Sequence, residues 1–183
     1  MYELHKSYLN LGSNIEPQMN LAKAVQLLLE YGEIQKISNV WESRSAGGPG
    51  PNYLNLCLLF ASPHAKSDLK EQVISSIEAR LGRKRTEDKY VPRTIDIDII
   101  LFDDQPYNDR FWETAFVIVP LAEIYPEYRN STTGERITEI AARLRQNAWM
   151  ETRPEVMSQR SGNNSISWNC SGSDPREIFA KNS

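Results

Sequence analysis

One stretch, TIDIDIILF at residues 94–102, constrains the fold and chemistry of this chain more than any other. Asp96 and Asp98 alternate with isoleucines there, and side chains alternate between two faces along a β-strand. The pattern predicts a strand with both carboxylates on one face and the isoleucines on the other. Two carboxylates about 6–7 Å apart repel by roughly 2–3 kcal/mol at an effective dielectric constant near 20, so a positive group is expected between them.

Basic residues lie just before this strand. Carboxylate oxygens suit Mg²⁺, which prefers one or two carboxylates together with substrate phosphates. Cationic side chains upstream could meet those phosphates: Arg83, Lys84, Arg85, Lys89 and Arg93. Either feature alone is also compatible with a solvated surface. Their combination favours a metal and phosphate site.

Length and composition indicate one ordinary globular domain. The chain has 183 residues, and 40% of them are hydrophobic, which is enough for a real core. We expect the domain to span residues 1–154. Residues 155–183 are rich in Ser, Asn and Gly and aperiodic, which predicts a poorly ordered tail.

Charge and cysteine content exclude several classes of protein. A formal net charge of −3 gives no global field that would attract nucleic acid. The two cysteines, Cys57 and Cys170, give no disulfide framework and no zinc spacing. No segment has membrane-spanning length, and the N-terminus has no apolar signal region. A cytoplasmic, monomeric protein that acts on small molecules is expected.

The hydrophobic pattern predicts the order β-α-β-β-α-β, followed by an extra strand and a C-terminal helix. This is an α+β, ferredoxin-like arrangement with additions. The helices are expected after Pro17, after a capping box of Asp68 and Glu71, and around residues 137–144. The strands are expected at residues 4–11, 34–42, 53–60, 94–102 and 115–119.

The strand YLNLCLLF at residues 53–60 also has two distinct faces. The leucines at 54, 56 and 58 share one face with Phe60. Tyr53, Asn55 and Cys57 therefore share the other face. An asparagine can pair a donor and an acceptor with the edge of a heterocycle, and an aromatic ring can stack on its face.

Four segments resemble the 6-hydroxymethyl-7,8-dihydropterin pyrophosphokinase family of folate biosynthesis, over roughly residues 6–145. The strongest is PRTIDIDIILF at 92–102, preceded by Gly82, Arg83 and Arg85. The others are YLNLGSN at 8–14, YLN at 53–55 and FVIVPLAEIYPE at 116–127. Each is weak alone, but the four in this order are specific. The resemblance implies transfer of the β,γ-pyrophosphoryl group of ATP to the hydroxymethyl oxygen of the pterin, with release of AMP.

The resemblance also implies roles for the residues of these segments. Asp96 and Asp98 would hold two Mg²⁺ ions that bridge ATP phosphates. Arg83 and Arg93 would stabilise charge on the transferred group. The implied ATP-binding set is Glu78, Arg83, Arg85, Lys89, Arg93 and Arg110. The implied pterin-binding set is Ser43, Ala46, Tyr53, Asn55, Tyr90 and Phe116.

The chain departs from the family pattern before Phe116. The family usually has a PHP-type segment there, which gives a histidine and an arginine to ATP binding. Here DDQPYNDRFWETAFVIV is shorter and has no histidine. Thr114 stands in place of the arginine, and Arg110 is the basic residue that remains. The segment from Ser43 to Ser45 also differs from the TxP-type sequence of the family.

These departures leave two further functions open. One is a divergent, non-catalytic or repurposed module that binds pterin or nucleotide. The retained Asp96, Asp98 and Arg93 argue against it, because paired strand carboxylates without a metal are costly. The other is a nucleic-acid-binding domain with a ferredoxin-like sheet. The aromatic pattern of such sheets and a basic excess are missing here.

Overall fold

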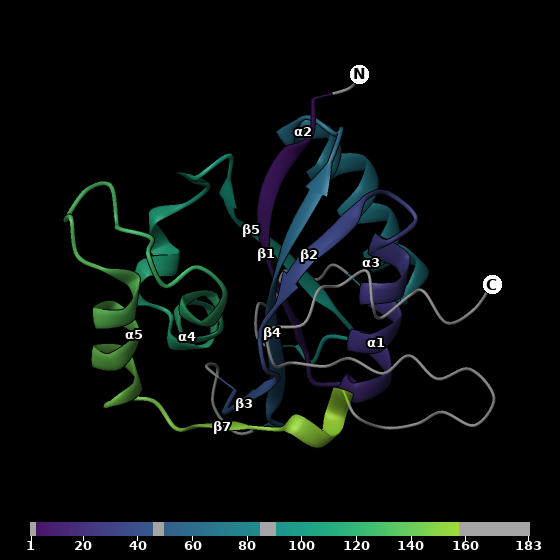
Figure 1. Cartoon of the computed structure of the whole chain (residues 1–183). Coiled ribbons are helices and arrows are strands. Elements are labelled where there is room, and N and C mark those ends of the chain that lie inside the picture. The colour runs from purple at the N-terminus through teal and green to yellow at the C-terminus, as the bar shows by residue number, and fades with distance from the viewer. Residues whose placement is uncertain (1–2, 46–49, 85–90, 158–183) are drawn as a thin grey trace.

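The computed structural model describes residues 3–45, 50–84 and 91–157. Within these residues one antiparallel sheet has the strand order β6-β5-β1-β4-β3-β7, and β2 also pairs with β4 (Figure 1). The strands are β1 His5–Ser13, β2 Glu33–Ile37, β3 Trp41–Ser43, β4 Tyr53–Ser62, β5 Asp96–Phe102, β6 Gln105–Pro106 and β7 Met150–Thr152. The four strands of the predicted ferredoxin-like sheet correspond to β1, β2 with β3, β4 and β5, so the predicted fold class is confirmed.

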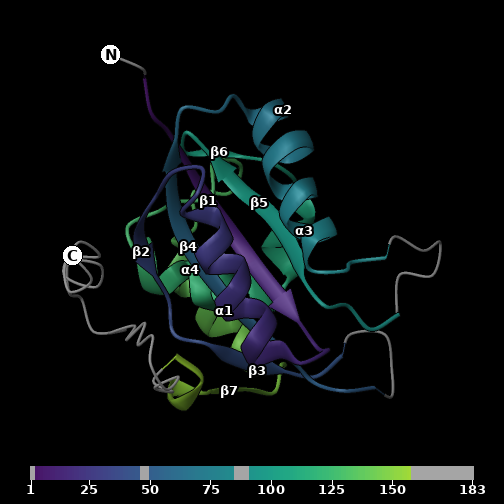
Figure 2. The same ribbon diagram turned by 90° about the vertical axis from the view of Figure 1, so that its right-hand side faces the viewer.

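Helices cover both faces of this sheet (Figures 1 and 2). On one face lies α1, Pro17–Leu28, beside the helix formed by α2 Lys66–Asp68, the π-helical turn η1 Leu69–Ile74 and α3 Ser75–Arg80. On the other face lie α4, Ala115–Ile124, and α5, Ile137–Arg145. Two short 3₁₀ helices complete the described chain: η2 Asp109–Glu113 and η3 Pro154–Met157. In the described residues no helix combines the length and apolarity needed to cross a membrane.

The two faces of the sheet carry two separate cores, and the side chains of the central strands divide between them. The first core lies under α1 and α3 and takes the even-numbered apolar side chains of β4 together with two isoleucines of β5: Leu54, Leu56, Leu58, Phe60, Ile97 and Ile99. Cys57 and Leu59 point into the second core, under α4 and α5. Asp96 and Asp98 therefore lie on the face of the second core, opposite to the isoleucines.

The prediction of a strand at residues 115–119 is wrong, because these residues begin α4. The segment is buried against the sheet and α5, with Val117, Ile118 and Val119 all in the second core. A short, fully apolar run has the same pattern in a buried strand and in a buried helix. The strands added to the ferredoxin-like core are instead β6 and β7, at the two ends of the sheet.

Two smaller predictions also need correction. The strand expected at 34–42 is interrupted between β2 and β3, where the Ser38 hydroxyl accepts a hydrogen bond from the backbone N–H of Cys57 at 2.9 Å. The capping box of Asp68 and Glu71 does not form, because the helix begins earlier, after Ala65. The end of this helix at Gly82 is as predicted, with a φ of +74° that favours glycine.

The predicted tail lies mostly outside the described residues. Of residues 155–183, the structure describes only 155–157, which belong to η3. Val156 packs into the first core. The domain boundary at residue 154 stays a prediction.

Candidate active site

The candidate site lies at one end of the central strands, on the face of the second core. Gly12 of β1 is paired with Asp96 of β5 on one side and with Asn55 of β4 on the other. Residues paired directly across antiparallel strands share a face. The predicted metal-binding carboxylate and the predicted pterin-binding amide therefore lie in one row, separated by a residue without a side chain.

Gly12 keeps the space between these two groups open. A Cβ atom at this position would lie 3.0 Å from Oδ1 of Asn55 and 3.9 Å from Cδ1 of Tyr53. Any larger side chain would extend from this point between the two flanking strands. The glycine thus leaves room for a ligand beside Asp96 and Asn55.

Asp96 is held by both predicted catalytic arginines. The Arg83 guanidinium lies 2.6 Å from Oδ1 of Asp96, and the Arg93 guanidinium pairs with Oδ2. Arg83 also pairs with Glu78, whose side chain is only 3% exposed. Glu78 in turn accepts a hydrogen bond from the backbone N–H of Ile97 at 3.0 Å. One buried carboxylate thus ties Arg83 to the residue between the two aspartates.

The segment after β1 positions Arg93. Oδ1 of Asn14 accepts from the backbone N–H of Arg93 at 2.7 Å, and the N–H of Asn14 donates to the carbonyl of Arg93 at 3.1 Å. The Ser13 hydroxyl donates to the carbonyl of Thr94 at 2.5 Å. Ser13 and Asn14 were not among the predicted site residues. The only signal for them was their place at the end of the motif YLNLGSN.

The negative charge of Asp98 is less well paired with cations than that of Asp96. Among the described residues, Arg110 forms an ion pair with Asp98 at 3.9 Å, and the Arg110 side chain is 68% exposed. Burial, and then the neighbouring Asp96 carboxylate, raise the pKa of Asp98 above its usual value. Asn10 lies opposite Asp98 on β1. Its buried Oδ1 has no hydrogen-bond partner among the described residues.

These carboxylates fit a hard divalent cation. Asp96 and Asp98 offer oxygen ligands on one face, and a cation there would relieve the repulsion that raises the pKa of Asp98. In the described part of the chain no group of three or more acidic, histidine or cysteine side chains could hold a metal ion. The protein would therefore supply two carboxylates and leave other positions to phosphate or water, which is how Mg²⁺ is usually bound.

We expect Asp98→Asn to stabilise the metal-free protein at neutral pH. Because the folded-state pKa of Asp98 is raised, ionisation of this group disfavours folding. The metal-free protein should lose stability as pH rises through that pKa. The substitution removes this loss, and each kcal/mol relieved should raise the melting temperature by about 2–4 °C.

Asp96→Asn should not have this effect, because Asp96 neutralises Arg83 and Arg93. Thermal melts of both variants in EDTA, at pH values from 4 to 8, test the contrast. A lower melting temperature for Asp98→Asn than for the wild type at neutral pH would contradict it.

The predicted pterin residues on β3 and β4 also meet at this end of the sheet. Nδ2 of Asn55 donates to Oγ of Ser43 at 2.9 Å, and both residues are buried. Burial raises the pKa of Tyr53, while Arg93 acts in the opposite direction, which places the phenol in the field of the arginine. Phe116 lies half-buried at the start of α4, over the same face of the sheet.

Of the remaining predicted site residues, the structure describes Arg110 but not the other four. Arg110 of η2 approaches Asp98 but also lies over the Phe111 ring, 5.0 Å from its centroid. Its role in ATP binding stays a prediction. Ala46, Arg85, Lys89 and Tyr90 lie outside the described residues.

Comparison with known proteins identifies a family and several similar proteins. Residues 8–126 match the family model described as 7,8-dihydro-6-hydroxymethylpterin-pyrophosphokinase (HPPK). A 2-amino-4-hydroxy-6-hydroxymethyldihydropteridine pyrophosphokinase from Synechocystis sp. is 33% identical over 149 residues, which are 75% of each chain. The protein of the same name from Aquifex aeolicus is 36% identical over 133 residues, which cover 65% of this chain and 79% of that one.

Solved structures share the fold at low identity. Wild-type Plasmodium falciparum HPPK-DHPS with pteroate has a TM-score of 0.59 and 13% sequence identity. The match covers 79% of this chain and 43% of that one. The same protein with pterin and p-hydroxybenzoate has a TM-score of 0.62 and 13% identity, over 80% of this chain and 44% of that one. This chain therefore spans less than half of each of those solved chains.

Proposed function

This chain belongs to the 7,8-dihydro-6-hydroxymethylpterin-pyrophosphokinase family, and we propose that Asp96, Asp98, Arg83 and Arg93 carry out the family reaction in it. The enzyme transfers pyrophosphate from ATP to the hydroxymethyl group of 6-hydroxymethyl-7,8-dihydropterin and releases AMP. The observation that best supports these roles is the row of Asp96, Gly12 and Asn55 across three strands. In this row the carboxylate that would face the phosphates and the amide that would bind the pterin lie on either side of Gly12.

In this reaction the hydroxymethyl oxygen attacks the β-phosphorus of ATP. A new O–P bond forms, the bond between the β-phosphorus and the α,β-bridging oxygen breaks, AMP leaves with that oxygen, and the hydroxyl proton passes to water. The pterin would be held by Asn55, with Ser43 and Tyr53 beside it. When bound, Mg²⁺ supplies Lewis-acid stabilisation of the phosphate oxygens and lowers the pKa of the attacking hydroxyl.

The arginines would act on the transferred group. Asp96 holds the guanidiniums of Arg83 and Arg93 on the face of the sheet where the phosphates would lie. Guanidinium forks bind phosphate oxygens through parallel hydrogen bonds and stabilise their charge. Glu78 restrains Arg83 through an ion pair with its guanidinium. Positioning and charge stabilisation make up most of the catalysis of phosphoryl transfer.

Product analysis tests this function directly. Purified protein should convert ATP and 6-hydroxymethyl-7,8-dihydropterin to AMP and the pterin pyrophosphate in equal amounts, and only with Mg²⁺. Formation of ADP instead of AMP would contradict pyrophosphate transfer. Binding of pterin without any turnover would favour the alternative of a repurposed binding module.

We expect weak discrimination between purines. The segment between β5 and α4 holds β6 and η2 and has no histidine, and its one basic residue is Arg110. A lost charge-assisted contact is worth roughly 1.5–3 kcal/mol, or about ten- to a hundredfold in affinity. Calorimetric titration with non-hydrolysable ATP and GTP analogues in Mg²⁺ should give dissociation constants within about tenfold of each other. A strong preference for adenine would show that other residues have replaced the missing contacts.

We further propose a monomeric, cytoplasmic enzyme that uses two Mg²⁺ ions and works without nucleic acid. The substrates are small molecules. The net charge of −3 provides no global attraction for nucleic acid.

A further inference from the structure

The segment from Met150 to Val156 wraps around the edge of the sheet next to the pterin residues. It leaves α5, pairs with β3 as β7, and ends in η3 beside α1, on the opposite face (Figure 1). The backbone N–H of Arg153 donates to the carbonyl of Val40 at 2.8 Å. We call residues 150–156 the strap. The segment that matches the family model ends at residue 126, so the strap lies outside the matched segment.

Glu42 of β3 contacts both the strap and the residue that precedes β4. Its carboxylate accepts from Nε of Arg153 at 2.6 Å and from Nδ2 of Asn52 at 2.7 Å. Glu42 immediately precedes Ser43, and Asn52 immediately precedes Tyr53. One carboxylate, held by Arg153, therefore joins the two segments that present these pterin residues.

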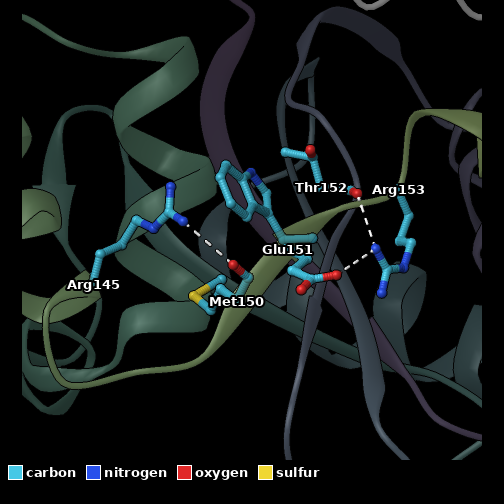
Figure 3. A pocket seen from close by; sticks show the side chains of 6 residues that line it. Arg145, Met150, Glu151, Thr152 and Arg153 are labelled. Atoms are coloured by element: carbon cyan, nitrogen blue, oxygen red, sulfur yellow. Dashed lines mark hydrogen bonds and ion pairs between the residues drawn. The ribbon is translucent and has the colours of Figure 1, made fainter.

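Arg153 also neutralises a cross-strand pair of like charges. Glu42 and Glu151 are directly opposite each other on β3 and β7, an arrangement that is destabilising in itself. The Arg153 guanidinium lies 2.5 Å from Glu42 and 2.8 Å from Glu151, and Figure 3 shows its contact with Glu151. Without this guanidinium the two carboxylates would push β7 and β3 apart.

A second arginine anchors the other end of the strap. Arg145 donates to the carbonyl of Met150 at 3.3 Å, and its guanidinium lies 4.7 Å from the centroid of the Trp41 ring (Figure 3). These residues line a pocket of about 390 Å³ that contains none of the predicted site residues. The strap is thus fixed at both ends outside the substrate site.

The position of β3 matters for Asn55. β3 has only three residues, and it pairs with β4 through Trp41, Glu42 and Ser43. The buried amide of Asn55 donates to Ser43, so a small shift of β3 would release one end of this amide and let it turn. Its orientation decides whether a donor or an acceptor faces the heterocycle.

We propose that Arg153 is a positioning residue for the pterin site. It holds Glu42, and through Glu42 it fixes the segments that carry Ser43 and Tyr53 and keeps the Asn55 amide in register. This role rests on the proposed function, in which these three residues bind the pterin. Arg153 itself contacts no substrate.

The test measures the two substrates separately. Arg153→Ala should raise the KM for the pterin by about tenfold, because small misplacements of binding groups are costly, and should leave the KM for ATP within about twofold. Arg153→Lys should restore part of the loss, since it keeps the charge but not the fork. Adding Glu151→Gln to Arg153→Ala should also restore part of it, by removing the repulsion with Glu42.

Arg143→Ala is the matched control, because it breaks an exposed pair between Arg143 of α5 and Glu135, which precedes that helix, at 3.1 Å. It should change neither KM. An unchanged pterin KM in Arg153→Ala, or equal rises in both KM values, would overturn the proposal. Equal rises would indicate a purely structural role.

A second readout does not depend on turnover. The side-chain amide protons of Asn55, followed by NMR, should exchange with water at least about tenfold faster in Arg153→Ala, because local opening exposes them. Unchanged exchange would overturn the proposal even if the kinetics changed. Absence of turnover in the wild type would instead refute the proposed function. The exchange rate of the Asn55 amide protons would still test whether Arg153 positions this side chain.

Discussion

Asp96→Asn and Asp98→Asn are expected to lower pyrophosphate transfer by about a thousandfold or more while leaving the fold intact. In the proposed site, each change would remove a charged oxygen ligand from the face where the phosphates would meet the cation. The Lewis-acid contribution of a bound metal ion is worth several kcal/mol, which corresponds to several orders of magnitude in rate. Initial rates of AMP release at saturating Mg²⁺ measure the effect.

Asp103→Asn is the matched control for these two variants. Asp103 follows β5 at its other end, where it accepts hydrogen bonds from His5 and from the backbone of Lys6. It should retain near-wild-type turnover. Near-wild-type turnover in either Asp96→Asn or Asp98→Asn would show that the metal assignment is wrong.

Arg93→Ala is expected to lower turnover by several orders of magnitude with only a modest effect on substrate binding. In the proposed mechanism its charge would act on the transferred group as charge develops in the transition state. The fold should survive, because the contacts of Arg93 with Asn14 use only the backbone of Arg93, and Asp96 keeps Arg83 as a partner.

Steady-state kinetics with both substrates varied separate turnover from binding. Arg80→Ala is a suitable control, because Arg80 pairs with Glu30 on the exposed surface of α3, at 2.7 Å. A loss in Arg93→Ala no larger than in Arg80→Ala would mean that the basic residues form only a solvated surface.

The strand faces were predictable because alternation is a local property. TIDIDIILF and YLNLCLLF each place polar and apolar groups on opposite sides, and the two cores take them as expected. The helix at α4 was not predictable from its pattern. An apolar run such as AFVIV contains no polar residue, so it has no periodicity that distinguishes a helix from a strand.

The contacts that position the site depend on tertiary structure. Arg83 pairs with Asp96 across 13 positions of the chain, and the bonds of Asn14 to Arg93 join residues 79 positions apart. The link from Arg153 to Glu42 spans 111 positions. Neither periodicity nor spacing encodes such contacts, and only the resemblance of the YLNLGSN segment gave any sign of Asn14.

The most direct test of the central claim is a metal titration. Mn²⁺ can replace Mg²⁺ at oxygen-ligand sites, and its binding can be counted by electron paramagnetic resonance in the presence of a non-hydrolysable ATP analogue and the pterin. We predict two bound Mn²⁺ ions per chain in the wild type, fewer in both Asp96→Asn and Asp98→Asn, and no change in Asp103→Asn. Unchanged Mn²⁺ binding in the two site variants would contradict the assignment of these aspartates as the metal ligands.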